Sequence, residues 1–180
     1  HEFDPDGARG TVAQQAAAEV QVSPVRAAVH GGRLHGAAGS AGEIAYMRVP
    51  GGRLHERCSA AGLVSAVCRV KGLPDGSLDG HDVFDFLAKG DPAAQEEVAL
   101  LIESLADAIT NVVCVVNPER IVLGGGIMAQ EAVLRPRVED ALRTRLSPPV
   151  YAATELSFAA TGNDAGMLGA LYHFLQEQGV

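Results

Sequence analysis

The feature that most constrains the fold is a long amphipathic helix pattern followed at once by a short strand and three glycines. Across residues 92–116, apolar residues recur three and four positions apart, which is the spacing of one helix face. Asp91 is a typical N-cap, and Asn117-Pro118 predicts the end of the helix. Residues 120–123 form a buried-type strand that runs into Gly124-Gly125-Gly126. The chain must therefore pack a long helix beside a strand that ends in a glycine turn.

Helices and strands alternate through the second half of the sequence. The pattern after the glycines predicts a helix from about 128 to 146, interrupted at Arg135-Pro136, a strand over 155–159 and a last helix over about 164–176. Upstream, the pattern predicts strands over 25–29 and 44–49 and helices over 60–70 and 82–89, and it permits a helix over 12–20. Strands that alternate with helices imply parallel crossovers, so the predicted class is α/β.

The pentapeptide Gly-Gly-Arg-Leu-His occurs twice, at 31–35 and 51–55. A solenoid would need more copies at a fixed period. We interpret the two copies as two hairpin turns of similar chemistry, with chance similarity as the alternative.

Charge, aromatic content and cysteine content argue against several classes of protein. The chain has 14 Lys and Arg against 22 Asp and Glu, a net charge of −8, and only 4% aromatic residues, which argues against a nucleic-acid-binding surface. Cys58, Cys68 and Cys114 form no C-x-x-C pair, so we expect reduced thiols and a cytoplasmic location. No uninterrupted apolar run approaches the ~20 residues of a membrane span, so no membrane partner is expected.

The first residues read differently from the rest. His1-Glu2-Phe3 resembles the end of a purification tag and a cloning scar, so we expect a piece of a longer protein. We divide the chain into residues 1–24, a tag remnant and poorly patterned segment, and residues 25–180, the folded lobe.

Two places could contact a ligand. Gly124, Gly125 and Gly126 follow a strand, and ligands gather at the carboxyl ends of strands in α/β sheets, although a plain tight turn is the alternative. Glu43 follows a loop of small residues, where a carboxylate can accept hydrogen bonds from sugar hydroxyls or simply lie on the surface. The histidines have no metal-ligand spacing and no nucleophile elbow is present, so neither a metal site nor a catalytic residue is predicted.

Several motifs resemble, in order, those of the ROK family (repressors, unassigned reading frames, kinases). Residues 117–127, Asn-Pro-Glu-Arg-Ile-Val-Leu-Gly-Gly-Gly-Ile, are similar to its Asn-Pro-x-x-[Ile/Val]-[Val/Ile]-Leu-Gly-Gly-Gly segment. Residues 41–44, Ala-Gly-Glu-Ile, resemble the start of its Ala-Gly-Glu-[Ile/Leu]-Gly-His motif. The Asn-Asp-Ala-Gly-Met-Leu-Gly-Ala-Leu run at 163–171 also fits, and the resemblance covers residues 25–175.

This resemblance implies the second lobe of an actin/hexokinase-like (ribonuclease H-like) ATPase fold, with a mixed sheet and flanking helices. In family kinases the triple-glycine loop forms the adenosine side of the nucleotide site, which would make Gly124, Gly125 and Gly126 cofactor-binding residues. Glu43 matches the carboxylate that binds sugar hydroxyls, and Tyr46 stands beside it as a second substrate-binding residue. Family members commonly form dimers or tetramers through this lobe, so a homo-oligomer is expected.

The departures from the family pattern are as informative as the match. Ala45-Tyr46 replaces the usual Gly-His, and Tyr46 offers a hydroxyl but no metal-binding nitrogen. In the family's zinc segment, Cys58 keeps one ligand position, whereas Glu56 and Leu63 replace two cysteines. Ser65 stands where the second sugar-binding glutamate would be. Zinc binding is therefore not expected.

No first-lobe motif is present in residues 1–30, neither the phosphate-binding Asp-x-Gly-Gly-Thr nor a catalytic aspartate, so this chain should have no kinase activity and hold no cofactor. The favoured hypothesis is the sugar-sensing, oligomerising lobe of a ROK transcriptional regulator whose DNA-binding domain lies upstream. The alternative is the nucleotide- and sugar-binding lobe of a carbohydrate kinase that uses ATP and Mg²⁺. A third hypothesis is a degenerate relative retained for oligomerisation.

Overall fold

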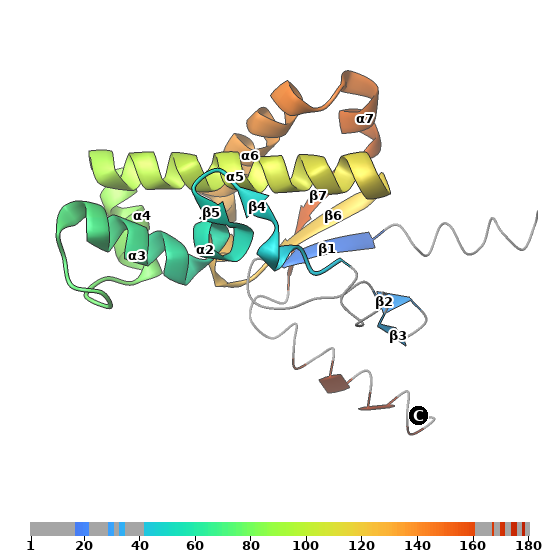
Figure 1. The fold of residues 1–180 in the computed structure, drawn as a ribbon, viewed down its shortest axis with the longest axis horizontal. Coiled ribbons are helices and arrows are strands. Elements are labelled where there is room, and N and C mark those ends of the chain that lie inside the picture. Colours follow the sequence, from blue (N-terminus) through green and yellow to red (C-terminus); the bar gives the residue numbers. More distant parts are fainter. Residues whose placement is uncertain are drawn as a thin grey trace, which may run out of the picture.

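A computed structural model describes residues 17–21, 29–30, 33–34 and 42–160, together with residues 167, 170, 171, 174, 175 and 178. The chain forms the predicted α/β architecture (Figure 1). The elements are β1 (Ala17–Gln21), β2 (Val29–His30), β3 (Arg33–Leu34), the 3₁₀ helix η1 (Ile44–Tyr46), β4 (Arg48–Val49), β5 (Gly52–Arg53), α2 (Leu54–Cys58), α3 (Ala60–Lys71), α4 (Gly80–Ala88), α5 (Pro92–Val116), β6 (Arg120–Gly124), the 3₁₀ helix η2 (Gly126–Gln130), α6 (Glu131–Arg145), α7 (Pro148–Ala153) and β7 (Glu155–Phe158).

The main sheet has β6 at its centre, with β1 and β7 parallel to it on either side. Gln21 of β1 pairs with Gly124, so the glycine turn begins where the sheet ends. Ile121 and Leu123 are two residues apart on β6 and are both fully buried in the core. This spacing of two is expected of a strand with one face on the core. Elsewhere in the described ranges, strands form two antiparallel pairs, β2–β3 and β4–β5. The α/β class is confirmed.

The long helix α5 organises the core. Asp91 accepts a hydrogen bond from the Ala94 N–H at 3.0 Å, and Asn117 ends the helix in a left-handed conformation at φ 47°, as the sequence predicts. Twelve of its 25 residues are buried, against α2, α3, α4 and α6. By length and composition, it is the one helix of the described part that could cross a membrane. Its buried face is instead occupied by other elements of the same chain.

The region after the glycines differs from the prediction in two places. Pro136 lies inside α6 and does not interrupt it, because Leu134, Val138 and Leu142 bury one face of this helix against the core and outweigh the local cost of proline. The helix ends at Arg145, close to the predicted residue 146, but the Ser147-Pro148-Pro149 run then begins α7, a short helix that the pattern did not predict, with proline at the first helical position.

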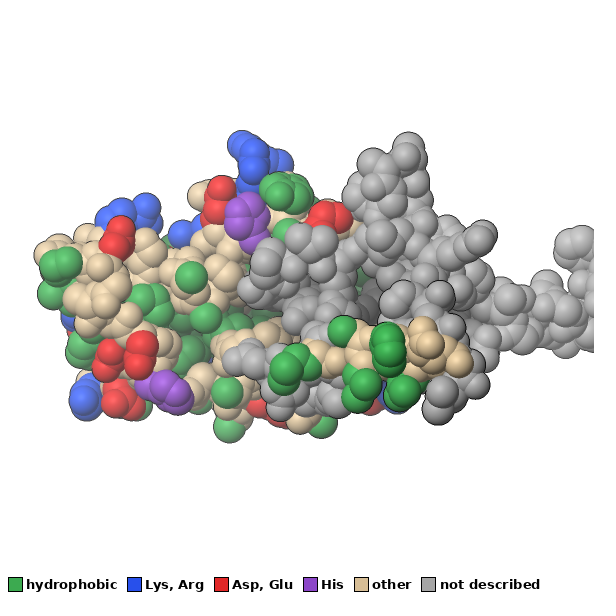
Figure 2. All heavy atoms as spheres, turned by 90° about the horizontal axis from the view of Figure 1, so that it is seen from below, with side chains coloured by type: hydrophobic (Ala, Val, Ile, Leu, Met, Phe, Trp, Pro, Cys, Tyr) green, Lys and Arg blue, Asp and Glu red, His purple; other side chains and the backbone are tan. Residues whose placement is uncertain are grey.

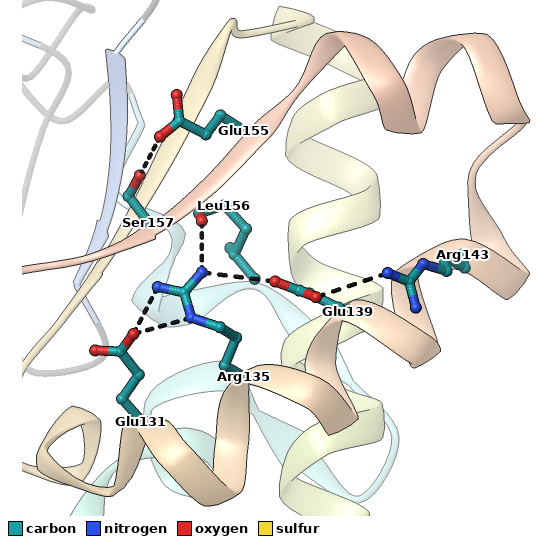
Figure 3. Close-up of polar contacts among 7 residues, drawn as sticks. All are labelled: Glu131, Arg135, Glu139, Arg143, Glu155, Leu156 and Ser157. Carbon is teal, nitrogen blue, oxygen red and sulfur yellow. Dashed lines mark hydrogen bonds and ion pairs between the residues drawn. The ribbon is translucent and has the colours of Figure 1, made fainter.

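Arg135 joins α6 to β7 (Figure 3). Its guanidinium donates to Glu131 Oε1 at 2.6 and 2.9 Å and to the Leu156 carbonyl at 3.1 Å. Glu139 lies 3.5 Å away, and the Phe158 ring lies beneath the guanidinium, 4.6 Å from centroid to carbon. These contacts hold α6 against the edge strand of the sheet.

Two upstream segments differ from what the sequence pattern permits or predicts. Residues 17–21 form the strand β1 and not part of a helix over 12–20. Their backbone pairs with β6, which lies far along the chain, so the local pattern does not reveal this pairing. Residues 44–49 form η1 and the two-residue strand β4, since Glu43 caps a helical turn there. The expected helix over 164–176, with its capping Asn163-Asp164, lies largely outside the described residues. The proposed boundary at residue 25 stays a prediction, with β1 on its N-terminal side.

Both copies of the repeated pentapeptide contribute to hairpins, as predicted. His30 pairs with Arg33 in one, and Val49 pairs with Gly52 in the other. The two copies differ in register by one residue.

Candidate functional site

Glu43 lies at the entrance to η1 with one carboxylate oxygen engaged and the other free. Its Oε1 accepts a hydrogen bond from the Ala45 N–H at 3.1 Å and so caps η1. Its Oε2 is buried and has no hydrogen-bond partner among the described residues. A buried, unpaired carboxylate oxygen costs free energy that a hydroxyl donor would recover.

Tyr46 lies on the same turn and is 61% exposed. The edge of the His55 ring meets it at 5.5 Å between centroids, and the Arg53 guanidinium lies 5.5 Å from its centroid. His55 in turn places its Nδ1 2.9 Å from the Ala45 carbonyl oxygen. These contacts from β5 and α2 fix Tyr46 beside Glu43 while much of the ring remains accessible.

The positions that correspond to zinc ligands do not form a metal centre. Cys58 is fully buried and its thiol donates to the Leu101 carbonyl at 3.6 Å. Burial raises the pKa of this thiol to about 12, so it stays protonated and is a poor ligand. Leu63 packs in the core, and Glu56 accepts a hydrogen bond from the Arg53 N–H at 2.8 Å. Within residues that the structure describes, no three His, Cys, Asp or Glu side chains are grouped to hold a metal.

The three glycines form the turn from β6 into η2. Gly125 has φ 97°, a conformation that favours glycine, and caps η2. Gly126 and Ile127 line a mostly apolar cavity of about 220 Å³ with Leu63 of α3 and with His81 and Phe84 of α4. Figure 2 shows hydrophobic side chains gathered along the middle of one face, with charged side chains at its edges. A flat, mostly apolar group would fit this cavity.

The predicted site residues therefore fall into two groups. Glu43 and Tyr46 come together on η1, whereas Gly124, Gly125 and Gly126 lie at the carboxyl end of β6. Sequence reasoning did not assign Arg53, His81 or Phe84 to a site, because their neighbours come from other elements. His55 lies against Tyr46, whereas the Cys58 thiol faces the core.

Comparison with known sequences gives one consistent result. The model of the ROK family matches residues 27–177. The chain is 47% identical over 146 residues to an uncharacterized protein of Clostridium perfringens, covering 81% of this chain and 50% of that protein. It is 37% identical over 105 residues to a beta-glucoside kinase of Klebsiella pneumoniae, covering 58% of this chain and 33% of that protein. It is 29% identical over 172 residues to a glucokinase of Halalkalibacterium halodurans, covering 83% of this chain and 52% of that protein. The chain spans about half the length of such relatives or less.

Solved structures agree. A ROK hexokinase from Thermus thermophilus superposes with a TM-score of 0.71 at 26% identity, over 88% of this chain and 57% of that one. A ROK family protein from Streptococcus pneumoniae in complex with sucrose superposes with a TM-score of 0.68 at 26% identity, over 82% of this chain and 53% of that one. A ROK family transcriptional regulator, a homologue of the E. coli MLC protein, superposes with a TM-score of 0.59 at 25% identity, over 78% of this chain and 40% of that one.

Proposed function

The chain belongs to the ROK family, and from this premise we propose that it is the sugar-sensing and oligomerising lobe of a ROK transcriptional regulator. Its fold is that of the actin-like ATPase proteins among its structural neighbours. Those neighbours include both sugar kinases and a regulator, so membership alone does not choose between the two roles.

The unpaired oxygen of Glu43 carries the sugar-binding part of the proposal. A sugar hydroxyl that displaces the groups covering Oε2 would satisfy this buried acceptor, and hydrogen bonds to charged groups contribute about 1.5–3 kcal/mol each. Tyr46 adds a hydroxyl and an exposed ring that can cover the apolar face of a sugar. The sucrose bound to the Streptococcus pneumoniae relative supports this class of ligand.

The altered motifs support a sensing role over a catalytic one. By the family resemblance, Tyr46 and Ser65 replace two sugar-binding residues of the kinases, and Cys58 and Leu63, at two zinc-ligand positions of the motif, pack in the core. A sensor needs ligand binding that shifts a conformational population, and it does not need a reacting hydroxyl to be positioned against a phosphate donor. Contact with DNA would belong to a separate domain, since this chain carries a net charge of −8.

The sugar site is tested by calorimetric titration of the chain with neutral sugars: glucose, N-acetylglucosamine and sucrose. We expect one of them to bind, and we expect Glu43→Gln to weaken that binding about tenfold or more because the amide accepts a weaker hydrogen bond. Glu96→Gln removes the same charge from an exposed position of α5 and serves as the control. Equal binding by wild type and Glu43→Gln would overturn the proposal.

A second function is favoured by the cavity at the glycine turn. Gly126, Ile127 and Phe84 offer an apolar slot beside the triple glycine, as a kinase lobe would need for the base of a nucleotide. In that case ATP and Mg²⁺ would be cofactors of the complete protein. Titration with a non-hydrolysable ATP analogue and Mg²⁺ distinguishes the roles. Binding that His81→Ala weakens would favour the kinase, whereas sugar binding without nucleotide binding would favour the regulator.

A further inference from the structure

The turn η1 has Glu43 at its N-cap and Tyr46 as its last residue, and hydrogen bonds hold it more than burial does. None of its three residues is buried, although Ile44 packs in part against the core. The Met47 N–H closes the turn on the Ile44 carbonyl at 2.9 Å, and the Leu54 N–H of α2 donates to the Met47 carbonyl at 2.9 Å. The orientation of Glu43 therefore depends on individual hydrogen bonds around η1.

One of these hydrogen bonds comes from the side chain of His55, whose Nδ1 lies 2.9 Å from the Ala45 carbonyl oxygen. A carbonyl oxygen can only accept, so Nδ1 carries the hydrogen. The N–H of the same residue, Ala45, donates to Glu43 Oε1 at 3.1 Å. His55 and Glu43 thus bind the two polar backbone groups of one residue. Below, we call this pair of hydrogen bonds the Ala45 clamp.

The imidazole of His55 also contacts the next residue of the turn. Its edge meets the Tyr46 ring at 5.5 Å between centroids, with the two ring planes at 68°. One side chain of α2 therefore contacts Ala45 and Tyr46 in succession, and through Ala45 it is linked to Glu43.

The first turn of α2 holds His55 in this position. Glu56 Oε2 accepts a hydrogen bond from the Arg53 N–H at 2.8 Å, and this contact caps the helix that carries His55. The other oxygen of the same carboxylate, Oε1, lies 3.9 Å from His55 Nε2, which is beyond hydrogen-bonding distance. Glu56 therefore caps the helix without hydrogen-bonding the imidazole.

We propose that His55 is a positioning residue of the sugar site, and that its Nδ1–H holds Glu43 in the orientation that binds a sugar hydroxyl. Without this donor the peptide groups of η1 can rotate, and the Ala45 N–H then turns away from Glu43 Oε1. The carboxylate gains other orientations, and ordering it again costs part of the free energy of sugar binding. The role in sugar binding rests on the proposed function, whereas the Ala45 clamp rests on the contacts of Ala45.

The test compares two amide side chains that reach different nitrogens of the imidazole. The amide nitrogen of asparagine is as many bonds from Cα as Nδ1, and that of glutamine is as many as Nε2. His55→Asn can therefore keep the donor to Ala45, whereas His55→Gln cannot. In calorimetry with glucose, N-acetylglucosamine and sucrose, we expect His55→Asn to bind about three- to tenfold more tightly than His55→Gln. Both variants lose the ring beside Tyr46, so each is the control for the other.

A second measurement needs no ligand and reads the Ala45 clamp directly. It is the rate at which the Ala45 amide hydrogen exchanges with water, measured by NMR. We expect similar rates in wild type and His55→Asn, and a rate at least about threefold higher in His55→Gln, because the Ala45 N–H leaves Glu43. The melting temperatures of the two variants should agree, which shows that the difference in binding does not come from unfolding.

Three results would overturn the proposal. Equal sugar affinity in His55→Asn and His55→Gln would exclude a role for the Nδ1 donor. Tighter binding by His55→Gln would assign the contribution to Nε2 instead. Equal exchange of the Ala45 amide in both variants would exclude the Ala45 clamp. If the wild type binds none of the three sugars, the proposed function fails, and the exchange rates alone decide whether His55 fixes η1.

Discussion

Cys58 occupies a position that holds a metal ligand in the family motif, yet its thiol lies in the core. The side chain is fully buried and donates to the Leu101 carbonyl of α5. Leu63, at another former ligand position, packs in the same core. At these two positions the side chains contribute buried apolar surface to the core.

The raised pKa of Cys58 predicts a loss of stability at alkaline pH. The folded chain keeps this proton up to a pKa of about 12, whereas the unfolded chain releases it near 9. Between these values the unfolded state binds fewer protons, so the free energy of unfolding should fall as pH rises, by at most about 1.4 kcal/mol per pH unit from this group. Urea unfolding of wild type and Cys58→Ala at pH 8, 9.5 and 10.5 measures the slope. Parallel slopes for the two proteins would contradict the prediction.

Between elements, the contact of α2 with α3 depends on Gly62. A Cβ at this residue would lie 2.0 Å from the Glu56 carbonyl oxygen, which is backbone and cannot move aside cheaply. Gly62→Ala should therefore lower the free energy of unfolding by about 1–3 kcal/mol. Gly80→Ala, at the start of α4, is the matched control because a Cβ there meets nothing within 4 Å. We expect that control to be neutral or stabilising by about 0.5–1 kcal/mol in chemical denaturation.

Arg145 fastens the end of α6 to α5. Its guanidinium pairs with Glu103 and donates from Nε to Asp107 at 2.7 Å, and its side chain is 19% exposed. Arg145→Gln should destabilise the chain by about 1 kcal/mol, because a half-buried network is lost. Among the described residues, Arg143 forms its ion pairs within α6, with Glu139 and Asp140, its guanidinium lies 5.4 Å from the Tyr151 ring centroid, and its side chain is 55% exposed. Arg143→Gln should change the free energy of unfolding by less than about 0.5 kcal/mol. Equal losses of stability in Arg145→Gln and Arg143→Gln would contradict this prediction.

The strongest local signals gave the right elements. Asp91, Pro92 and Asn117 delimit α5 as predicted, and Gly72 ends α3 in a left-handed conformation. The errors at β1 and Pro136 share one cause: each depends on a partner distant in sequence, β6 for the strand and the core face for the helix. Local propensity is weaker than such tertiary contacts.

At the scale of the whole molecule, the chain should fold without zinc. Of the residues at the family's zinc-ligand positions, Cys58 and Leu63 pack in the core and Glu56 accepts a hydrogen bond from the Arg53 N–H. These contacts hold the segment in place. We expect elemental analysis of the purified chain to find well under one zinc per chain, and we expect EDTA or 1,10-phenanthroline to leave its melting temperature unchanged. Stoichiometric zinc, or a drop in melting temperature with chelator, would contradict this prediction.

The sequence by itself determined the α/β class, the long helix, the strand with its glycine turn and the family, because these depend on spacing and motifs along the chain. It also identified Glu43 and Tyr46 as candidates, through the family motif. Only the tertiary structure decided that Oε2 of Glu43 is buried without a partner among the described residues, and that His55 and Arg53 frame Tyr46. Burial and pairing depend on which elements meet in space, and a linear pattern does not contain that information.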